Sequence, residues 1–237
     1  GINLNTGISE TFSQYLQDTY STENIKTWGV NRIDHTLGIF AESEIKFTKK
    51  FAIKPGIRGE YGTLLEKASV SPRFSAALKT GKNSQLSGAW GIYYQNPEFD
   101  YLKFNPDLKL EKATHYILSY QSGRVDNQLF RTEIYYKKYD HLITWEGNNE
   151  YYPQNIANQG NGYARGIDIF WRDKKSIRRF DYWVTYSFID TKRNYQNYPE
   201  MATPDFISKH NFSLVTKYWI NALTTQVGMS FNASSGR

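Results

Sequence analysis

Residues 51–61 read FAIKPGIRGEY, and the alternation in this stretch decides the kind of fold. One alternate set of residues carries no charge, whereas the other contains three charged residues, Lys54, Arg58 and Glu60. Successive side chains of a strand point to opposite faces, so this period of two predicts a β-strand with one apolar and one polar face. The apolar face either covers a soluble core or contacts lipid around a barrel whose interior is lined by the charges.

Composition narrows the function classes. The chain has 237 residues, of which 22% are charged and 16% are aromatic, and its mean hydropathy of −0.65 is that of a soluble protein. No apolar run approaches the ~20 residues of a membrane helix, which excludes helical membrane proteins but leaves barrels open. There is no cysteine, and the net charge of +6 is spread out apart from a basic cluster at 172–179. We therefore expect neither a disulfide scaffold nor nucleic-acid binding.

Eleven segments with a period of two predict an all-β fold. Most are ten to fourteen residues long, whereas soluble strands average ~5–6 residues and tilted membrane-spanning strands need ~9–11. These lengths favour a membrane barrel. The predicted strands are 2–15, 34–47, 51–62, 69–79, 84–95, 112–121, 128–145, 161–171, 180–190, 209–218 and 222–233.

The connections between these segments alternate in length. A short connection such as 48–50 or 80–83 is followed by a longer one such as 63–68 or 96–111, almost throughout the chain. An antiparallel up-and-down meander places all short turns at one end, which is typical of outer-membrane barrels and not of Greek-key sandwiches. Pro55 and Pro72 lie inside predicted strands, where we expect them to mark bulges.

The strand faces sort the residues into two predicted sets. A polar set is expected to line the barrel interior: Glu42, Glu44, Lys54, Arg58, Glu60, Arg73, Arg131, Glu133 and Asp168. An apolar set is expected to face lipid: Phe51, Ile53, Ile57, Tyr61 and Trp90. Aromatic residues also gather beside the short turns, as they do in the girdle of a membrane barrel.

Longer stretches strengthen this interpretation. They include GIFAESEIKFTKKFAIKPGIRGEY (38–61), SPRFSAALK (71–79), LSGAWGIYYQNPEF (86–99), LKLEKATHYILSYQ (108–121) and NQGNGYARGIDIFWR (158–172), followed by YWVTYSFID (182–190), HNFSLVTKYW (210–219) and VGMSFNASSGR (227–237). Together they resemble the barrel of a TonB-dependent outer-membrane receptor of the Bacteroidetes type. The resemblance covers nearly the whole chain, although no single motif is decisive.

The resemblance implies a 22-stranded barrel filled by a plug domain. Eleven strands are about half of such a barrel, and neither a plug nor a TonB box is visible. We therefore expect residues 1–237 to be a fragment of the middle to late barrel without the plug. The implied function is uptake of a scarce ligand, such as an iron complex, cobalamin, peptide or glycan, across the bacterial outer membrane. Two alternatives remain: a soluble β-rich binding module, and a porin or adhesin barrel independent of TonB.

The resemblance also implies the partners of the full-length protein. They are outer-membrane lipid, the missing plug, the TonB complex acting through that plug, and a small-molecule or oligomeric ligand, with a surface lipoprotein lid as a further partner. Aromatic residues on the predicted long loops are the candidate ligand contacts: Trp145, Tyr151, Tyr152, Tyr195 and Tyr198.

No catalytic or cofactor site is expected. The sequence contains no nucleophile–base signature, phosphate loop or metalloprotease motif. The four histidines, His35, His115, His141 and His210, have no ligand spacing, so we expect no metal site.

Overall fold

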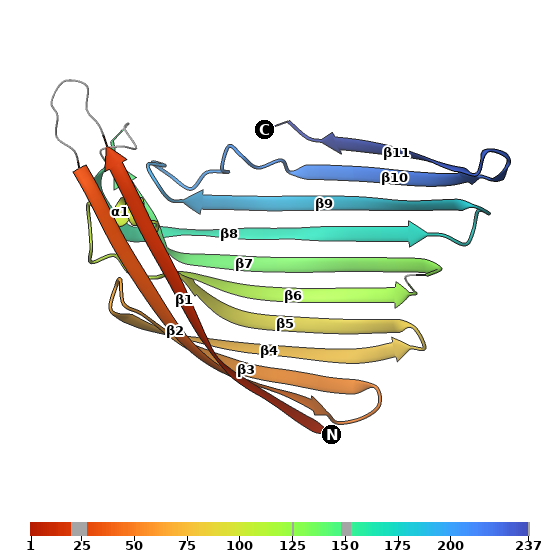
Figure 1. Cartoon of the computed structure of the whole chain (residues 1–237), viewed down its shortest axis with the longest axis horizontal. Coiled ribbons are helices and arrows are strands. Elements are labelled where there is room, and N and C mark those ends of the chain that lie inside the picture. The colour runs from red at the N-terminus through yellow and green to blue at the C-terminus, as the bar shows by residue number, and fades with distance from the viewer. Residues whose placement is uncertain (20–27, 125, 148–152, 237) are drawn as a thin grey trace.

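The computed structural model describes residues 1–19, 28–124, 126–147 and 153–236. Eleven strands make up most of this part of the chain (Figure 1). They are β1 (Ile2–Thr19), β2 (Trp28–Lys46), β3 (Phe51–Gly62), β4 (Lys67–Gly81), β5 (Ser84–Gln95), β6 (Glu111–Gly123), β7 (Gln128–Glu146), β8 (Gln154–Asp173), β9 (Phe180–Asn194), β10 (His210–Ile220) and β11 (Thr225–Ser234). A one-turn helix, α1 (Phe99–Leu102), and a 3-10 turn, η1 (Asn221–Leu223), complete the described elements.

The strands form one antiparallel sheet in which spatial order follows chain order from β1 to β11. This confirms the predicted eleven-strand up-and-down meander. The sheet is open, with β1 and β11 as its edges, and it twists so that β1 and β2 cross the later strands at a steep angle in Figure 1. No helix in the described ranges is long and apolar enough to span a membrane.

Several strands are longer than their sequence patterns predict. β2 begins at Trp28 rather than at 34, and β8 begins at Gln154 rather than at 161. Their additional residues, WGVNRI at 28–33 and QNIANQG at 154–160, mix polar and apolar side chains, and they continue the backbone ladder without the regular alternation from which strands are predicted. β11 begins at Thr225 because η1 occupies the preceding residues.

The prolines do not interrupt the sheet. The pairing of β3 with β4 runs in one register through Pro55, opposite Phe74, and through Pro72, opposite Ile57. The expectation that these prolines mark bulges is therefore wrong. Register shifts lie instead in β7, between Asp140 and Glu146, where His141 adopts a positive φ of 61°, and in β4, between Lys79 and Gly81.

The two ends of the sheet differ in the length of their connections. Connections 47–50, 82–83, 124–127, 174–179 and 221–224 lie at one end, on the right in Figure 1, and we call it the short-turn end. The opposite end carries 63–66, 96–110, 147–153 and 195–209, and we call it the loop end. The predicted asymmetry of the meander is confirmed.

The two faces of the sheet separate as predicted. Residues opposite one another in a ladder share a face, and the registers place all nine predicted polar residues on one face and all five predicted apolar residues on the other. The apolar face is the more exposed: Ile57 is 53% exposed, whereas the side chains of Arg58 and Glu60 on the polar face are each 26% exposed. This is the reverse of a soluble protein.

The buried apolar core lies among the loops and not against the sheet. Leu102 and Leu108 of connection 96–110 pack with Ile143, Trp145 and Ile156 from the loop ends of β7 and β8. Leu64, Leu65 and Tyr101 cover this cluster. Apolar burial therefore holds the loop end together, while the sheet is held by its ladder.

Candidate functional site

Large side chains lie flat over small residues on the polar face. A Cβ added at Gly38 would meet the guanidinium of Arg58 at 2.9 Å, and one at Gly166 would meet the hydroxyl of Tyr135 at 2.6 Å. Gly91 is covered in the same way by Tyr93, at 3.1 Å. Because side chains lie across the sheet instead of standing on it, the polar face stays shallow.

Charges on the polar face are only partly paired. Arg58 donates to Glu60 at 2.7 Å and to the hydroxyl of Ser9 at 2.9 Å, and Lys54 pairs with Glu42. A larger group has no ion pair within the described ranges: Arg73, Arg131, Glu133, Lys137, Asp168 and Arg193. The Nε atoms of Arg73 and Arg193 are buried without a hydrogen-bond partner.

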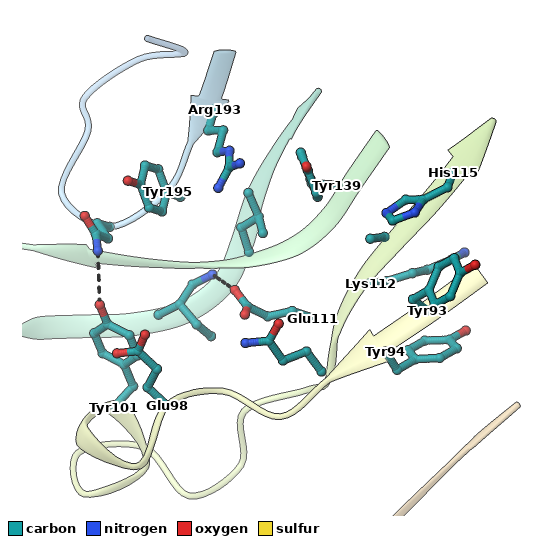
Figure 2. Close-up of a pocket in the computed structure, with 15 residues that line it drawn as sticks. Tyr93, Tyr94, Glu98, Tyr101, Glu111, Lys112, His115, Tyr139, Arg193 and Tyr195 are labelled. Carbon is teal, nitrogen blue, oxygen red and sulfur yellow. Dashed lines mark hydrogen bonds between the residues drawn. The ribbon is translucent and has the colours of Figure 1, made fainter. Parts of the chain in front are cut away.

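A cavity of about 480 Å³ opens on the polar face at the loop end (Figure 2). Its walls come from the ends of β5, β6, β7 and β9 and from connections 96–110 and 195–209. Tyrosines dominate the lining, with ionisable groups among them: Tyr93, Tyr94, Glu98, Tyr101, Glu111, Lys112, His115, Tyr139, Arg193 and Tyr195.

Arg193 extends into this cavity from β9 between two tyrosines (Figure 2). Its guanidinium carbon lies 4.6 Å from the ring centre of Tyr139 and 5.8 Å from that of Tyr195. Both distances allow cation–π attraction, which fixes the guanidinium while its Nε has no acceptor among the described residues. The site therefore offers a held cation with free hydrogen-bonding capacity.

The loop that carries Tyr195 is fixed by backbone bonds. Gln196 donates its N–H to Ile143 O at 2.6 Å and accepts from Trp145 N–H at 2.9 Å. The ring of Tyr195 meets that of Tyr198 edge to face at 5.1 Å, and burial is the main cause that raises the pKa of Tyr195 to about 12. Burial also raises the pKa of Tyr101. Both phenols are neutral at physiological pH and remain hydrogen-bond donors.

The predicted loop contacts fare differently. Tyr195 lines the cavity and Tyr198 packs beside it. Trp145 is only 8% exposed within the loop core, so its prediction as a ligand contact is corrected to a packing role. Tyr151 and Tyr152 lie outside the described residues.

Of the ten cavity residues named above, the sequence predicts only Tyr195 as a ligand contact, and the residues not predicted include Tyr93, Tyr101, Tyr139 and Arg193. Three of them are strand residues of the polar face, where the alternation alone does not separate ligand contacts from ordinary lining. Their signal was the coincidence of aromatic residues at the loop ends of neighbouring strands.

The histidines are dispersed. His115 lies on the polar face with its ring centre 4.6 Å from that of Tyr93, and the Nδ1 atom of His210 is 2.9 Å from the hydroxyl of Tyr186. Among the residues that the structure describes, no three His, Asp or Glu side chains gather at a metal-binding distance.

Asp34 of β2 ties two connections of the loop end to the sheet. Its buried carboxylate accepts hydrogen bonds from Leu64 N–H at 3.1 Å, Asn96 Nδ2 at 2.9 Å and Thr36 Oγ1 at 3.2 Å. We expect Asp34→Ala to reduce the unfolding free energy by about 1–3 kcal/mol, because it leaves buried donors unpaired. Urea unfolding measures the loss, and Glu10→Ala on exposed β1 is the control that should change little. Equal stability of the two variants would contradict a supporting role for Asp34.

Comparisons with known proteins agree with this fold. The family model "TonB dependent receptor-like, beta-barrel" matches residues 2–237. No curated protein sequence matches the chain. Solved structures with the same fold include the ferric-catecholate import receptor Fiu of Escherichia coli K12, at TM-score 0.74 and 12% identity, which the chain matches over 99% of its own length and 42% of the receptor.

Two structures from Pseudomonas aeruginosa are also similar. The ferric enterobactin receptor PfeA, solved with enterobactin, has TM-score 0.72 and 11% identity, with 100% of this chain and 40% of the receptor covered. The siderophore receptor PirA has TM-score 0.70 and 13% identity, with 98% and 42% covered.

The chain thus spans about two fifths of these three structures, in agreement with the expectation that it corresponds to part of a barrel. The assignment of the chain to the Bacteroidetes type of these receptors stays a prediction. The match of the family model to almost every residue, on an eleven-strand meander with an exposed apolar face, shows that the chain belongs to the family of TonB-dependent receptor β-barrels.

Proposed function

We propose that the chain forms part of the barrel wall of a receptor that takes up a scarce ligand across the bacterial outer membrane. Family membership gives the outer-membrane location and sets aside the soluble binding module and the porin or adhesin independent of TonB. The reversed exposure of the two faces supports the proposal. Apolar residues such as Ile57 contact lipid, and the polar face, with Arg58 and Glu60, lines the interior.

The single observation that carries the ligand assignment is the loop-end cavity. A held guanidinium at Arg193, with Lys112 and His115 nearby, favours a ligand that carries negative charge. Tyrosine rings such as Tyr93 and Tyr139 favour aromatic or sugar groups that stack. An anionic metal chelate with aromatic arms combines both features. The names of two similar structures, the ferric-catecholate import receptor Fiu and the ferric enterobactin receptor PfeA, agree with this class.

The remaining partners follow from the family. A plug domain covers the polar face and couples it to the TonB complex, which supplies the energy for uptake. A surface lipoprotein lid over the long loops is a further partner in this proposal. The barrel wall contributes the path, the contacts with the plug and the loop-end cavity.

Substitution of Arg193 tests the ligand assignment. In the full-length receptor, we expect Arg193→Gln to weaken the binding of ferric enterobactin by about tenfold to a hundredfold, because a charged hydrogen bond contributes ~1.5–3 kcal/mol. Quenching of intrinsic tryptophan fluorescence measures the affinity, and TonB-dependent uptake of the labelled complex measures function.

Lys192→Gln is the matched control, because Lys192 is the neighbouring cation of β9 on the opposite face. Its affinity should equal that of the unchanged receptor. Equal losses in the two variants, or no binding of the ferric chelate to the unchanged receptor, would refute the ligand assignment.

A further inference from the structure

The short-turn end carries the whole net charge of the chain. Its five connections hold eight Lys or Arg residues and one Asp, a net charge of +7 beside +6 for all 237 residues. The basic cluster at 172–179 forms one of these turns together with the end of β8. Neither the ligand cavity nor the polar face uses this charge, because both lie elsewhere on the sheet.

These cations are exposed and almost all lack an acidic partner. Within the described part of the chain, only Lys174 lies near a carboxylate, with its Nζ 4.0 Å from Asp181. Lys49, Lys175 and Arg178 are exposed and form no ion pair there. Unpaired cations at the rim of a structure attract anions from outside it.

Exposed apolar side chains lie at the same end of the sheet as the cations. Phe47 is 60% exposed in the connection after β2, Ile177 is 52% exposed in the connection after β8, and Leu223 is 66% exposed in the connection after β10. Ile177 stands between two basic pairs in the sequence KKSIRR. An apolar tip flanked by cations suits a lipid interface, where the apolar group enters the acyl boundary and the cations meet the headgroups.

An aromatic layer on the apolar face adjoins these turns. Phe47 stacks on Phe51 with ring centres 5.7 Å apart, and the ring centre of Phe130 in β7 lies 6.2 Å from that of Trp171 in the adjacent strand β8. Aromatic residues of this kind mark the level of the membrane interface. The cations therefore lie just beyond that level, where lipid phosphates are found.

The turn with the densest charge is held in place by the protein itself. The buried carboxylate of Asp173 accepts hydrogen bonds from the N–H groups of Lys175 at 2.8 Å and Ser176 at 2.9 Å, and from Gln128 Nε2 at 3.0 Å. The backbone of turn 174–179 is thus fixed, while Lys175, Arg178 and Arg179 form no ion pair within the described part of the chain.

We infer that the short-turn end of this barrel binds the phosphate groups of anionic phospholipids in the leaflet that it faces. Charge alone would also suit an acidic protein. The exposed apolar tips in three of the five turns and the adjoining aromatic layer favour a lipid surface, with which all three features make contact at once. This inference rests on the proposed placement of the barrel in the membrane.

Lipid selectivity of the reconstituted full-length receptor tests the inference. The receptor is placed in phosphatidylcholine vesicles with about 30 mol% phosphatidylglycerol, and the lipids that remain bound after detergent extraction are counted. We expect phosphatidylglycerol to be enriched several-fold over the bulk. Lys49→Gln, Lys175→Gln and Arg178→Gln combined should return the composition of the bound lipid to nearly that of the bulk, and raising NaCl from about 0.1 M to about 1 M should also reduce the enrichment.

A matched variant removes equal charge from the loop end through Lys109→Gln, Lys192→Gln and Lys209→Gln, and it should keep the enrichment. An equal loss in this control would overturn the inference, as would the absence of enrichment in the unchanged receptor. Competition by free inorganic phosphate at low salt would point to an anion site instead of a lipid surface and would also count against it. Ligand uptake is not measured here, so failure of this experiment leaves the Arg193 test of function untouched.

A single label reports whether the apolar tip enters the lipid. The 237 residues contain no cysteine, so Ile177→Cys gives this region one site for an environment-sensitive fluorophore. The labelled receptor is transferred from lipid-poor discs in detergent-free buffer to anionic vesicles. This transfer should shift the emission of the fluorophore to the blue. A label at Asn83→Cys, in a turn without an apolar tip, should shift less, and equal shifts would argue against insertion of Ile177.

Discussion

Ile57→Arg is expected to prevent stable membrane assembly of the barrel. Ile57 lies midway along β3 on the apolar face, opposite Ala41 and Pro72, and it is 53% exposed. An arginine at mid-depth on a lipid-facing surface costs ~2–4 kcal/mol in a membrane barrel. Urea-dependent unfolding of the reconstituted receptor measures this loss, and the membrane-inserted fraction in cells should fall with it.

Ala89→Arg is the matched control on the other face. Ala89 lies midway along β5 on the polar face, in the ladder row between Ser75 and Ile117. A cation added there meets other polar groups and should leave insertion nearly unchanged. If Ala89→Arg impaired insertion as much as Ile57→Arg, the assignment of the two faces to lipid and interior would be wrong.

The faces could be predicted from the sequence because a period of two is a local property. The alternation within strand 51–61 and within each neighbouring strand shows which residues share a face. The register then pairs the apolar face of one strand with the apolar face of the next. What the alternation does not state is which side is inward. The prediction that the apolar side faces lipid rests on strand length, which suits the thickness of a membrane, and on the alternation of short and long connections, which is typical of an outer-membrane barrel.

The loop core could not be predicted in the same way. The sequence predicts Trp145 as a ligand contact because it is an aromatic residue in a polar stretch. Its burial depends on Leu102 and Leu108 of connection 96–110 and on Ile156 of β8, which meet it only when the loop end is assembled. Three separate segments must converge, and no periodicity within one segment reports such a contact.

The cavity shows the same limit on a smaller scale. Tyr139 of β7 and Arg193 of β9 both lie opposite the same residue of β8. The whole of β8 separates their two strands along the chain. Each residue alone resembles ordinary polar lining. Their pairing becomes visible only through the small residue between them, Gly162, whose ladder positions oppose both.

Gly162 is one instance of a wider arrangement, in which glycines on the polar face make room for large neighbours. Tyr135 lies over Gly166 in the next strand, and Arg58 lies over Gly38. A shallow polar face follows, and a domain that covers this face would approach the sheet closely. Each glycine weakens its own strand, but it makes room for a large side chain on the polar face. We therefore attribute these glycines to the shape of that face.

Gly166→Ala should be among the most damaging single-methyl changes in this sheet. The new Cβ would collide with the carbonyl oxygen of Phe188 and lie 2.6 Å from the hydroxyl of Tyr135. Since the first of these atoms belongs to the backbone of β9, the collision cannot be relieved by rotating a side chain, and we expect a loss of about 1–3 kcal/mol in unfolding free energy. Urea unfolding in lipid measures it.

Two further glycine variants make the result specific. Gly38→Ala collides with the mobile ends of Arg58 and Ser9, which move aside, so its loss should be smaller than that of Gly166→Ala. Gly88→Ala on the apolar face finds Ile117 O at 3.8 Å, an ordinary contact, and should be neutral or slightly stabilising. The order of the three losses follows from whether backbone, side chain or open space receives the methyl group. Equal losses would show instead that general strand propensity sets the cost, and the proposed role of glycine on the polar face would fail.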